Sequence, residues 1–500
     1  MIKHFDIKSP LFSHLMGVLS HFHLSAIMKK LGFYKEKGVR PVAMVVHMIM
    51  SLLTCGSFNQ YLKQGKYECD ENLSKSAVYR FMSNDSYNWR GVHTEIAKVS
   101  TKYISGLAKD KSKFLIVDDS LYERSRSKST QMMSRVYDHC DHKFCNGFQY
   151  LQVCYSDGYT TLPVDFALVG AQRRKESRRK LKSGKHKRQL MINQVTGYDK
   201  RTAHGKRLRE CQDKKPNIAI AMIKRALNNG ITAKYVMFDS WFTTAPTVMR
   251  IKEMGLDVIG MVKHMRNTTY KHGKDGYFSI HDIIDQKDSL KWFEKAEPNN
   301  EGILGSCIVE TKVTANAPRP VKVKIVLVKD SRSSSSKKKV LAVLCTDTNL
   351  SNWEIISYYG YRWNIEESFY NQKQLLGLVD KCRANKFSSL ITHVTLVNIC
   401  SIILEIIRRD NADPRTFGGV FSDMAEQISD IPFSVAIDSL MQCFRKVVDT
   451  LDDANLIVKN KKKQAYAIVR KMLNEWYHQQ GEFFQKFLKA IKLEPTFEFT

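Results

Sequence analysis

The chain has 500 residues, which is long for one domain and predicts a core domain with added modules. Hydrophobic residues make up 43% and charged residues 26%, a balance that argues against both a disordered and a membrane-spanning protein. The 79 Lys and Arg residues against 50 Asp and Glu give a net charge of +29, which favours a polyanionic partner, and nucleic acid is the commonest large one.

Cysteine usage and hydropathy indicate a cytoplasmic protein. The 11 cysteines include no CxxC pair and do not suggest a disulfide framework. The two most apolar stretches are 42–53, too short for a bilayer span, and 394–407, which polar residues interrupt. Both predict buried helices. With neither a signal-peptide pattern nor a basic amphipathic anchor, we expect no membrane partner.

Residues 1–105 carry apolar residues at three- and four-residue spacing, which predicts a helical N-terminal domain. Within it, residues 74–81 place a polar cap before a basic and aromatic face, as a DNA-reading helix would. An ordinary packed helix gives the same pattern. We interpret 1–105 as a DNA-binding domain.

Residues 106–265 alternate strands with helices. Short apolar runs at 114–117 and 235–238 predict buried strands, and each is followed directly by aspartate. Residues 148–155 and 160–169 predict a hairpin around Ser156-Asp157-Gly158. Helices are expected at 218–227 and 245–254, and a strand at 257–262. The resulting order is three strands, helix, strand, helix, strand.

A strongly basic stretch, 172–215, separates the hairpin from the first core helix. It could lie along DNA and add salt-dependent, sequence-independent affinity. A solvated loop that orders only on binding is the alternative.

One group of potential zinc ligands stands before the hairpin: His139, Cys140, His142 and Cys145. Their spacing does not match a common zinc finger, and no second ligand pair lies nearby. We therefore expect no zinc site, and a supporting role for His139 in a turn or beside the active site.

The remainder of the chain divides into three parts. Strand-like runs at 302–313, 321–328 and 340–345 predict a β-rich insertion over 266–345, with the Ser- and Lys-rich piece 331–339 as a hairpin tip. Residues 346–405 would complete the core. Residues 406–500 are expected to form a helical dimerisation region.

Residues 359–373, called here the signature segment, contain Tyr359, Arg362, Glu366 and Lys373. On a continuous helix these four residues project to roughly 0°, −60°, −20° and −40°, which is one narrow stripe. A carboxylate flanked by two cations and a phenol suits a metal ligand surrounded by phosphate contacts. A solvated charged face is the alternative interpretation.

Asp118 and Asp239 follow the two buried strands, and with Glu366 they would form a set of three carboxylates. Three converging carboxylates repel one another unless cations neutralise them. Oxygen ligands select Mg²⁺, for which Mn²⁺ can substitute, and a pair of such ions suits in-line phosphoryl transfer. An aspartate at a strand end can instead simply cap the following helix.

The sequence resembles the bacterial insertion-sequence DDE transposases of the cut-and-paste, hairpin-forming group, marked by a Tyr-x2-Arg-x3-Glu-x6-Lys (YREK) motif. The signature segment matches this motif without a gap, and the 118–120 and 238–242 blocks resemble the family's two Asp blocks. The resemblance implies an α/β fold: a ribonuclease H-like core with a β-rich insertion, flanked by helical N- and C-terminal domains. It also implies excision through a DNA hairpin and strand transfer into target DNA.

The resemblance further assigns residue roles. Asp118, Asp239 and Glu366 would be the catalytic, metal-binding triad. Tyr359, Arg362 and Lys373 would contact DNA phosphates, and Trp363 would stack on a displaced base unless it packs in the core.

Several alternatives stay open at the level of sequence. A continuous apolar strand does not show whether Asp118 or Asp119 points inward, although the family's spacing favours Asp118. The expected partners are double-stranded DNA, at element ends with terminal inverted repeats and at the target, and a second copy of the chain. The other functions considered are a ribonuclease H-like nuclease or integrase without hairpin chemistry, and a domesticated DNA-binding protein.

Overall fold

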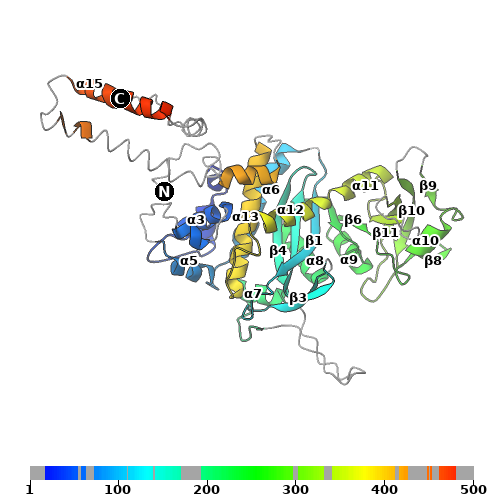
Figure 1. The fold of residues 1–500 in the computed structure, drawn as a ribbon. Helices are drawn as coiled ribbons and strands as arrows, with labels where there is room; N and C mark the ends of the chain where they lie inside the picture. The colour runs from blue at the N-terminus through cyan, green and yellow to red at the C-terminus, as the bar shows by residue number, and fades with distance from the viewer. Residues whose placement is uncertain are drawn as a thin grey trace.

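The computed structural model describes residues 17–54, 58–63, 73–109, 111–138, 141–170, 193–296, 302–330, 340–410, 416–425, 447–449, 451–452 and 461–479. Within these ranges the chain is a mixed α/β structure built on one large mixed sheet (Figure 1). The predicted α/β class is confirmed, and the sheet is consistent with a ribonuclease H-like core.

The core part of the sheet has the strand order β4–β3–β1–β5–β6. The strands are β1 (Phe114–Glu123), β3 (Lys143–Ser156), β4 (Thr161–Val169), β5 (Tyr235–Phe238) and β6 (Asp257–Met261). β3 is antiparallel to β1 and β4, as the predicted hairpin requires, whereas β1, β5 and β6 are parallel. β2 (Ser134–Asp138) pairs with the beginning of β3.

The insertion extends this same sheet rather than forming a separate one. Its elements are β7 (Thr269–His272), β8 (Gly276–Ser279), α10 (Ile280–Gln286), β9 (Glu294–Lys295), β10 (Ile303–Thr311), β11 (Lys322–Lys329) and β12 (Val340–Cys345). β12 pairs antiparallel with the core strand β6, and β11, β10, β7 and β8 follow outward. In Figure 1 these strands lie at the end of the sheet opposite the N-terminal helices.

Helices cover the core and its N-terminal side. The N-terminal ones are α2 (Leu24–Lys30), α3 (Pro41–Leu53), α4 (Phe58–Lys63), α5 (Lys75–Met82) and α6 (Trp89–Leu107). The later ones are α7 (Ala203–Glu210), α8 (Lys215–Asn228), α9 (Ala245–Lys252), α11 (Asn352–Gly360), α12 (Trp363–Gln374), α13 (Phe387–Asp410) and α15 (Lys462–Gln479). α5 buries Val78, Phe81 and Met82 and leaves Lys75 and Arg80 exposed.

The long apolar helix α13 lies at the centre of the protein (Figure 1). By length and composition it could cross a membrane, but 94% of its apolar window is buried inside the protein. It packs against α3, α5, α6 and β4. The sequence prediction that 42–53 and 394–407 form buried helices is therefore confirmed.

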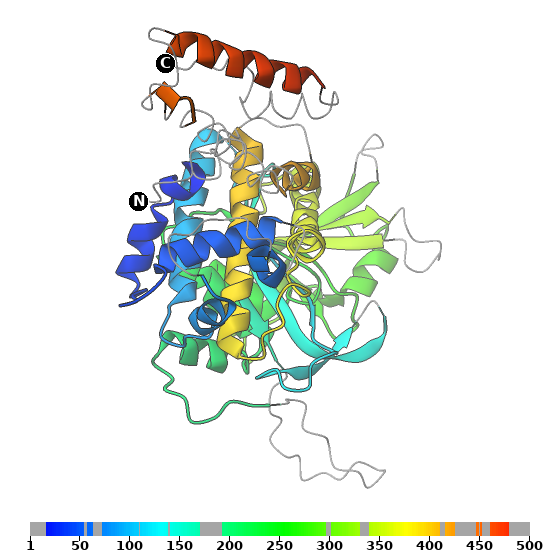
Figure 2. The same cartoon turned by 60° about the vertical axis from the view of Figure 1, so that its left-hand side comes forward.

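The expected C-terminal dimerisation region falls largely outside the described residues and stays a prediction. Within it, the structure describes the end of α13, three short pieces and α15. Figures 1 and 2 both show α15 apart from the main body.

Candidate active site

The register of the core sheet places Asp118 beside Asp239. The parallel pairing of β1 with β5 ends at Val117 opposite Phe238, and the two aspartates are the next residues on each strand. Neighbouring strands lie about 4.8 Å apart. Backbone hydrogen bonds between β1 and β5 thus bring together two aspartates that are far apart in the chain.

β1 continues to Glu123 and does not end at residue 117 as the sequence predicted, because β3 pairs with it along its whole length. Consecutive side chains on a strand point to opposite faces of the sheet. Asp118 accepts a hydrogen bond from Arg362 Nη1 at 2.8 Å, whereas Asp119 accepts one from Lys215 Nζ at 2.9 Å. The strand geometry therefore assigns Asp118 to the α12 side and Asp119 to the α8 side.

The signature segment is not one continuous helix, and this part of the sequence prediction is wrong. α11 ends at Gly360 and α12 begins at Trp363, with short-range hydrogen bonds from Tyr361 N to Tyr358 O and from Arg362 N to Tyr359 O, both 3.0 Å. The aromatic ring of Tyr361 lies against Gly158, where a Cβ would come within 3.1 Å of it. Gly158 also has φ +91, a backbone conformation that other residues rarely adopt. Both the close contact and the backbone conformation therefore favour glycine at this position.

The turn nevertheless keeps the motif residues together. The guanidinium of Arg362 donates to Asp118 and also to Glu366, so it joins β1 to α12. Lys373 Nζ donates to Ser120 Oγ at 2.8 Å, further along β1. The ring of Tyr359 lies 5.9 Å from the Arg362 guanidinium carbon.

Burial and mutual repulsion make the two aspartates poor anions in this arrangement. Burial raises the pKa of Asp118 to about 7; Arg362 opposes the shift and the charge of Asp239 adds to it. Burial also raises the pKa of Asp239, although the backbone N–H groups of Phe242 and Trp241 donate to its Oδ1. A cation at this site would favour the ionised form of both aspartates and so lower both pKa values.

Asp239 does not cap the following helix, the alternative weighed from the sequence, because the N-cap of α9 is Thr244; Asp239 caps the turn that follows β5. Its Oδ1 accepts hydrogen bonds from Trp241 N at 3.0 Å and Phe242 N at 3.1 Å, as a turn-capping aspartate does. Its Oδ2 has no hydrogen-bond partner in the described part of the chain. One oxygen therefore fixes the carboxylate, and the other is left for a ligand.

The donor set fits a hard divalent cation, although the described residues contain no group of three or more His, Cys, Asp or Glu side chains at metal-binding spacing. Asp118, Asp239 and Glu366 offer only oxygen atoms, which Mg²⁺ prefers. The positive group between Asp118 and Glu366 is the guanidinium of Arg362. Two carboxylates already share one cation there.

Two residues beside the site were missed by sequence analysis. Lys215, at the start of α8, pairs with Asp119, and its Nζ lies 4.0 Å from the centre of the Trp241 ring. Trp241 is 42% exposed and follows Asp239 by two residues. A lysine at the end of a long basic stretch carries no sequence signal that would separate it from the others.

Other sequence-predicted residues have mixed outcomes. Trp363 is 59% exposed, which rules out core packing. Residues 172–192 of the basic stretch lie outside the described residues. Arg207 is 4% exposed and pairs with Asp165, so it is not available to DNA. His139 and Cys140 also lie outside the described residues, and Cys145 is a buried free thiol.

Comparison with known proteins is consistent with this geometry. A family model described as DDE superfamily endonuclease matches residues 60–273, less than half of the chain. The match includes Asp118 and Asp239 and ends before the signature segment. No curated protein matches the chain. The match supports a DDE transposase family and a nuclease or transposase activity on DNA.

Proposed function

We propose that the chain is a DNA transposase that binds terminal inverted repeats, cleaves the element ends by two-metal phosphoryl transfer through a DNA hairpin, and joins them to target DNA. The observation that carries the proposal is the link from Asp118 through Arg362 to Glu366, with Asp239 placed beside Asp118 by strand register. A solvated charged face on α12 would not need carboxylates from β1 and β5 beside it.

The residues would divide the work as follows. Asp118, Asp239 and Glu366 would hold two Mg²⁺ ions, with Mn²⁺ as a substitute; when bound, the metal neutralises charge on the phosphoryl group and acidifies the attacking water or hydroxyl. Arg362 and Lys373 would hold backbone phosphates. Burial raises the pKa of Tyr359 to about 12, so its phenol stays a neutral hydrogen-bond donor. The exposed Trp363 would stack on a displaced base.

Two DNA ends would require two active sites, so we propose a homodimer in the DNA complex. The net charge of +29 would add non-specific affinity for the duplex that weakens with salt. A cytoplasmic, nucleoid-associated location in a bacterial host follows from the same proposal.

The test uses the full chain, Mg²⁺ and a duplex that carries a candidate element end with a labelled strand. We expect hairpin-ended product on a denaturing gel, and no product from Glu366→Gln. Nicks or open double-strand ends without hairpins would favour the nuclease or integrase alternative. Tight DNA binding with no cleavage in any divalent metal would favour a DNA-binding protein.

Lys215 should act as a positioning residue through Asp119. Replacing it with Met leaves Asp119 as an unpaired negative charge beside Asp118 and Asp239, both of which Asp119 already disfavours as anions. The added negative charge attracts Mg²⁺, so we expect Lys215→Met to lower the Mg²⁺ concentration needed for half-maximal cleavage by roughly tenfold, equivalent to about 1.4 kcal/mol.

Restoration is the informative control for Lys215. The double variant Lys215→Met/Asp119→Asn removes both charges and should return the Mg²⁺ requirement close to that of the wild type. If the Mg²⁺ requirement of the double variant is no closer to that of the wild type than the requirement of the single variant, Lys215 acts in another way, such as by holding Trp241.

A further inference from the structure

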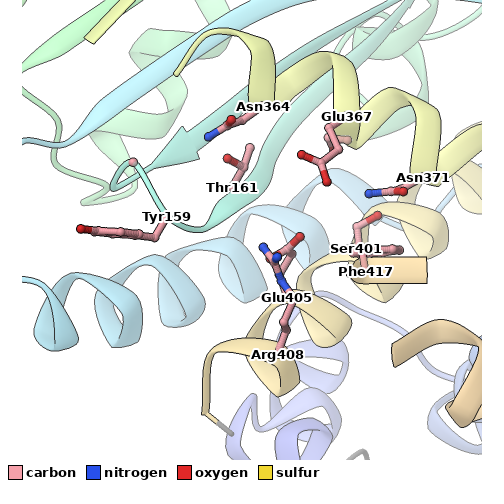
Figure 3. Close-up of a pocket in the computed structure, with 11 residues that line it drawn as sticks. Tyr159, Thr161, Asn364, Glu367, Asn371, Ser401, Glu405, Arg408 and Phe417 are labelled. Carbon is pink, nitrogen blue, oxygen red and sulfur yellow. The ribbon is translucent and has the colours of Figure 1, made fainter. Parts of the chain in front are cut away.

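A polar pocket lies on the side of α12 that faces away from Asp118. It encloses about 230 Å³ between the turn after β3, one face of α12, and α13 with Phe417 beyond it (Figure 3). Glu367 points into this pocket, whereas its neighbour Glu366 contacts Arg362. The pocket is therefore separate from the candidate active site but shares a helix with it.

Two polar side chains of the pocket have no partner among the described residues, and they differ in burial. Glu367 has no hydrogen bond or ion pair there, and it is exposed at the mouth of the pocket. Ser401 is 3% exposed, and its buried Oγ also lacks a hydrogen-bond partner. Figure 3 shows the Ser401 hydroxyl and the amide of Asn371 directed toward the same space as the Glu367 carboxylate. A buried hydroxyl without a partner, such as that of Ser401, is rare and marks a place where a ligand or water completes the hydrogen bonding.

The charges in the pocket do not balance. Glu405 is already paired, because it accepts from Arg408 Nε at 3.2 Å and Nη2 at 2.8 Å. Glu367 adds a second carboxylate without a second cation, which leaves one negative charge. This is a local exception in a chain of net charge +29. An occupant with a positive charge would restore the balance.

The chemistry of the walls favours a planar organic cation. Carboxylate and hydroxyl oxygens face the space, so an occupant with several N–H donors can satisfy more than one of them at once. A guanidinium carries five donors in a rigid fork and pairs with carboxylates through two parallel hydrogen bonds. A compact ammonium group has only three donors and would leave more of these groups unpaired. The described residues contain no cluster of three or more metal-ligating side chains, so a metal ion is not favoured here.

We propose that this pocket binds a guanidinium group, with Glu367 as its main anion and the Ser401 hydroxyl as a further acceptor. The group would come either from a small guanidinium compound or from an arginine side chain of a second copy of the chain. An occupant would contact α12 one residue away from Glu366. The proposal does not depend on the proposed function, since it concerns binding alone.

The first experiment compares L-arginine with L-citrulline, which has nearly the same shape but a neutral end group, by titration calorimetry on the full chain. We expect saturable binding of arginine and none of citrulline at the same concentrations. Glu367→Gln should weaken arginine binding by roughly ten- to a hundredfold, as expected for loss of a charged hydrogen-bonded pair, and Ser401→Ala by a smaller factor. Glu310→Gln, at an exposed carboxylate on β10, is the matched control and should bind normally.

The second experiment identifies the source of the guanidinium by sedimentation of the full chain with and without free arginine. Self-association that is weakened by both Glu367→Gln and free arginine assigns the group to a second copy. Self-association that neither alters, together with intact arginine binding, assigns it to a small molecule. Equal binding of arginine and citrulline, or normal arginine binding by Glu367→Gln, would overturn the proposal.

Discussion

Asp118→Asn should reduce the rate of DNA cleavage by about a thousandfold or more, whereas Asp119→Asn should stay within about tenfold of the wild type. A metal-binding carboxylate supplies several kcal/mol of transition-state stabilisation, and each 1.36 kcal/mol is a factor of ten. Asp118 pairs with Arg362, which also contacts Glu366. Asp119 pairs with Lys215 on the opposite face of the strand. Single-turnover cleavage with saturating Mg²⁺ measures both rates.

Thermal unfolding of the metal-free protein shows whether the Asp118→Asn variant is folded. Because burial raises the pKa of Asp118 to about 7 from an ordinary value of 3.8, its ionisation costs stability as the pH rises through that interval. The metal-free Asp118→Asn protein should therefore unfold at a temperature no lower than the wild type at pH 8. An active Asp118→Asn and an inactive Asp119→Asn would exchange the roles of the two residues.

Asp165→Asn should destabilise the protein by about 3–5 kcal/mol, the cost of removing one member of a buried ionic network. Asp165 on β4 is 1% exposed. Arg225 Nε donates to it at 2.7 Å, and guanidinium nitrogens of Arg90 and Arg207 lie 3.8 Å from it. Without the carboxylate, three arginines would face Glu210 alone. Urea unfolding followed by circular dichroism measures the change.

An exposed pair provides the control for this effect. Asp199 pairs with Arg201 at 3.1 Å, but their side chains are 45% and 91% exposed. Asp199→Asn should change the unfolding free energy far less than Asp165→Asn does, because exposed ion pairs contribute little to stability. Similar losses of unfolding free energy for Asp165→Asn and Asp199→Asn would show that the buried network contributes no more than an exposed pair.

The stability difference at Asp165 should also depend on pH. Burial by itself would raise the pKa of Asp165, but Arg225, Arg90 and Arg207 outweigh it and hold the pKa well below its ordinary value. A depressed folded-state pKa stabilises the protein above the unfolded-state pKa, and this contribution is lost as the pH falls through the folded-state value. The difference in unfolding free energy between the wild type and Asp165→Asn should therefore become smaller at acidic pH.

Local patterns in the sequence were sufficient to predict the short buried strands. Residues 235–238 and 340–345 were predicted with the bounds that β5 and β12 have, because each is a continuous apolar run with polar residues at both ends. The extension of β1 past residue 117 was not predictable in this way. It depends on pairing with β3, and polar residues such as Asp118 join that ladder only because the partner strand is present.

Tertiary contacts also explain the residues that sequence analysis misjudged. The turn in the signature segment depends on Tyr361 meeting Gly158, about two hundred residues earlier in the chain. Arg207 belongs to a run of basic residues, and only the position of Asp165 on β4 shows that it is buried. Charge patterns predict a partner of opposite sign but do not distinguish DNA from a carboxylate of the same chain.

The continuity of the sheet has a mechanical consequence. Gly260 on β6 is paired with Leu344 of the insertion on one side and with Phe238, directly before Asp239, on the other. A Cβ at Gly260 would lie 2.3 Å from Thr243 Oγ1, and that hydroxyl donates to the backbone carbonyl of Asp239 at 2.7 Å. The insertion is therefore continuous with the core sheet through backbone pairing on β6. A force applied to its outer hairpin would reach Asp239 as shear through adjoining strands, so the stiffness of β6 would set how far the carboxylate moves.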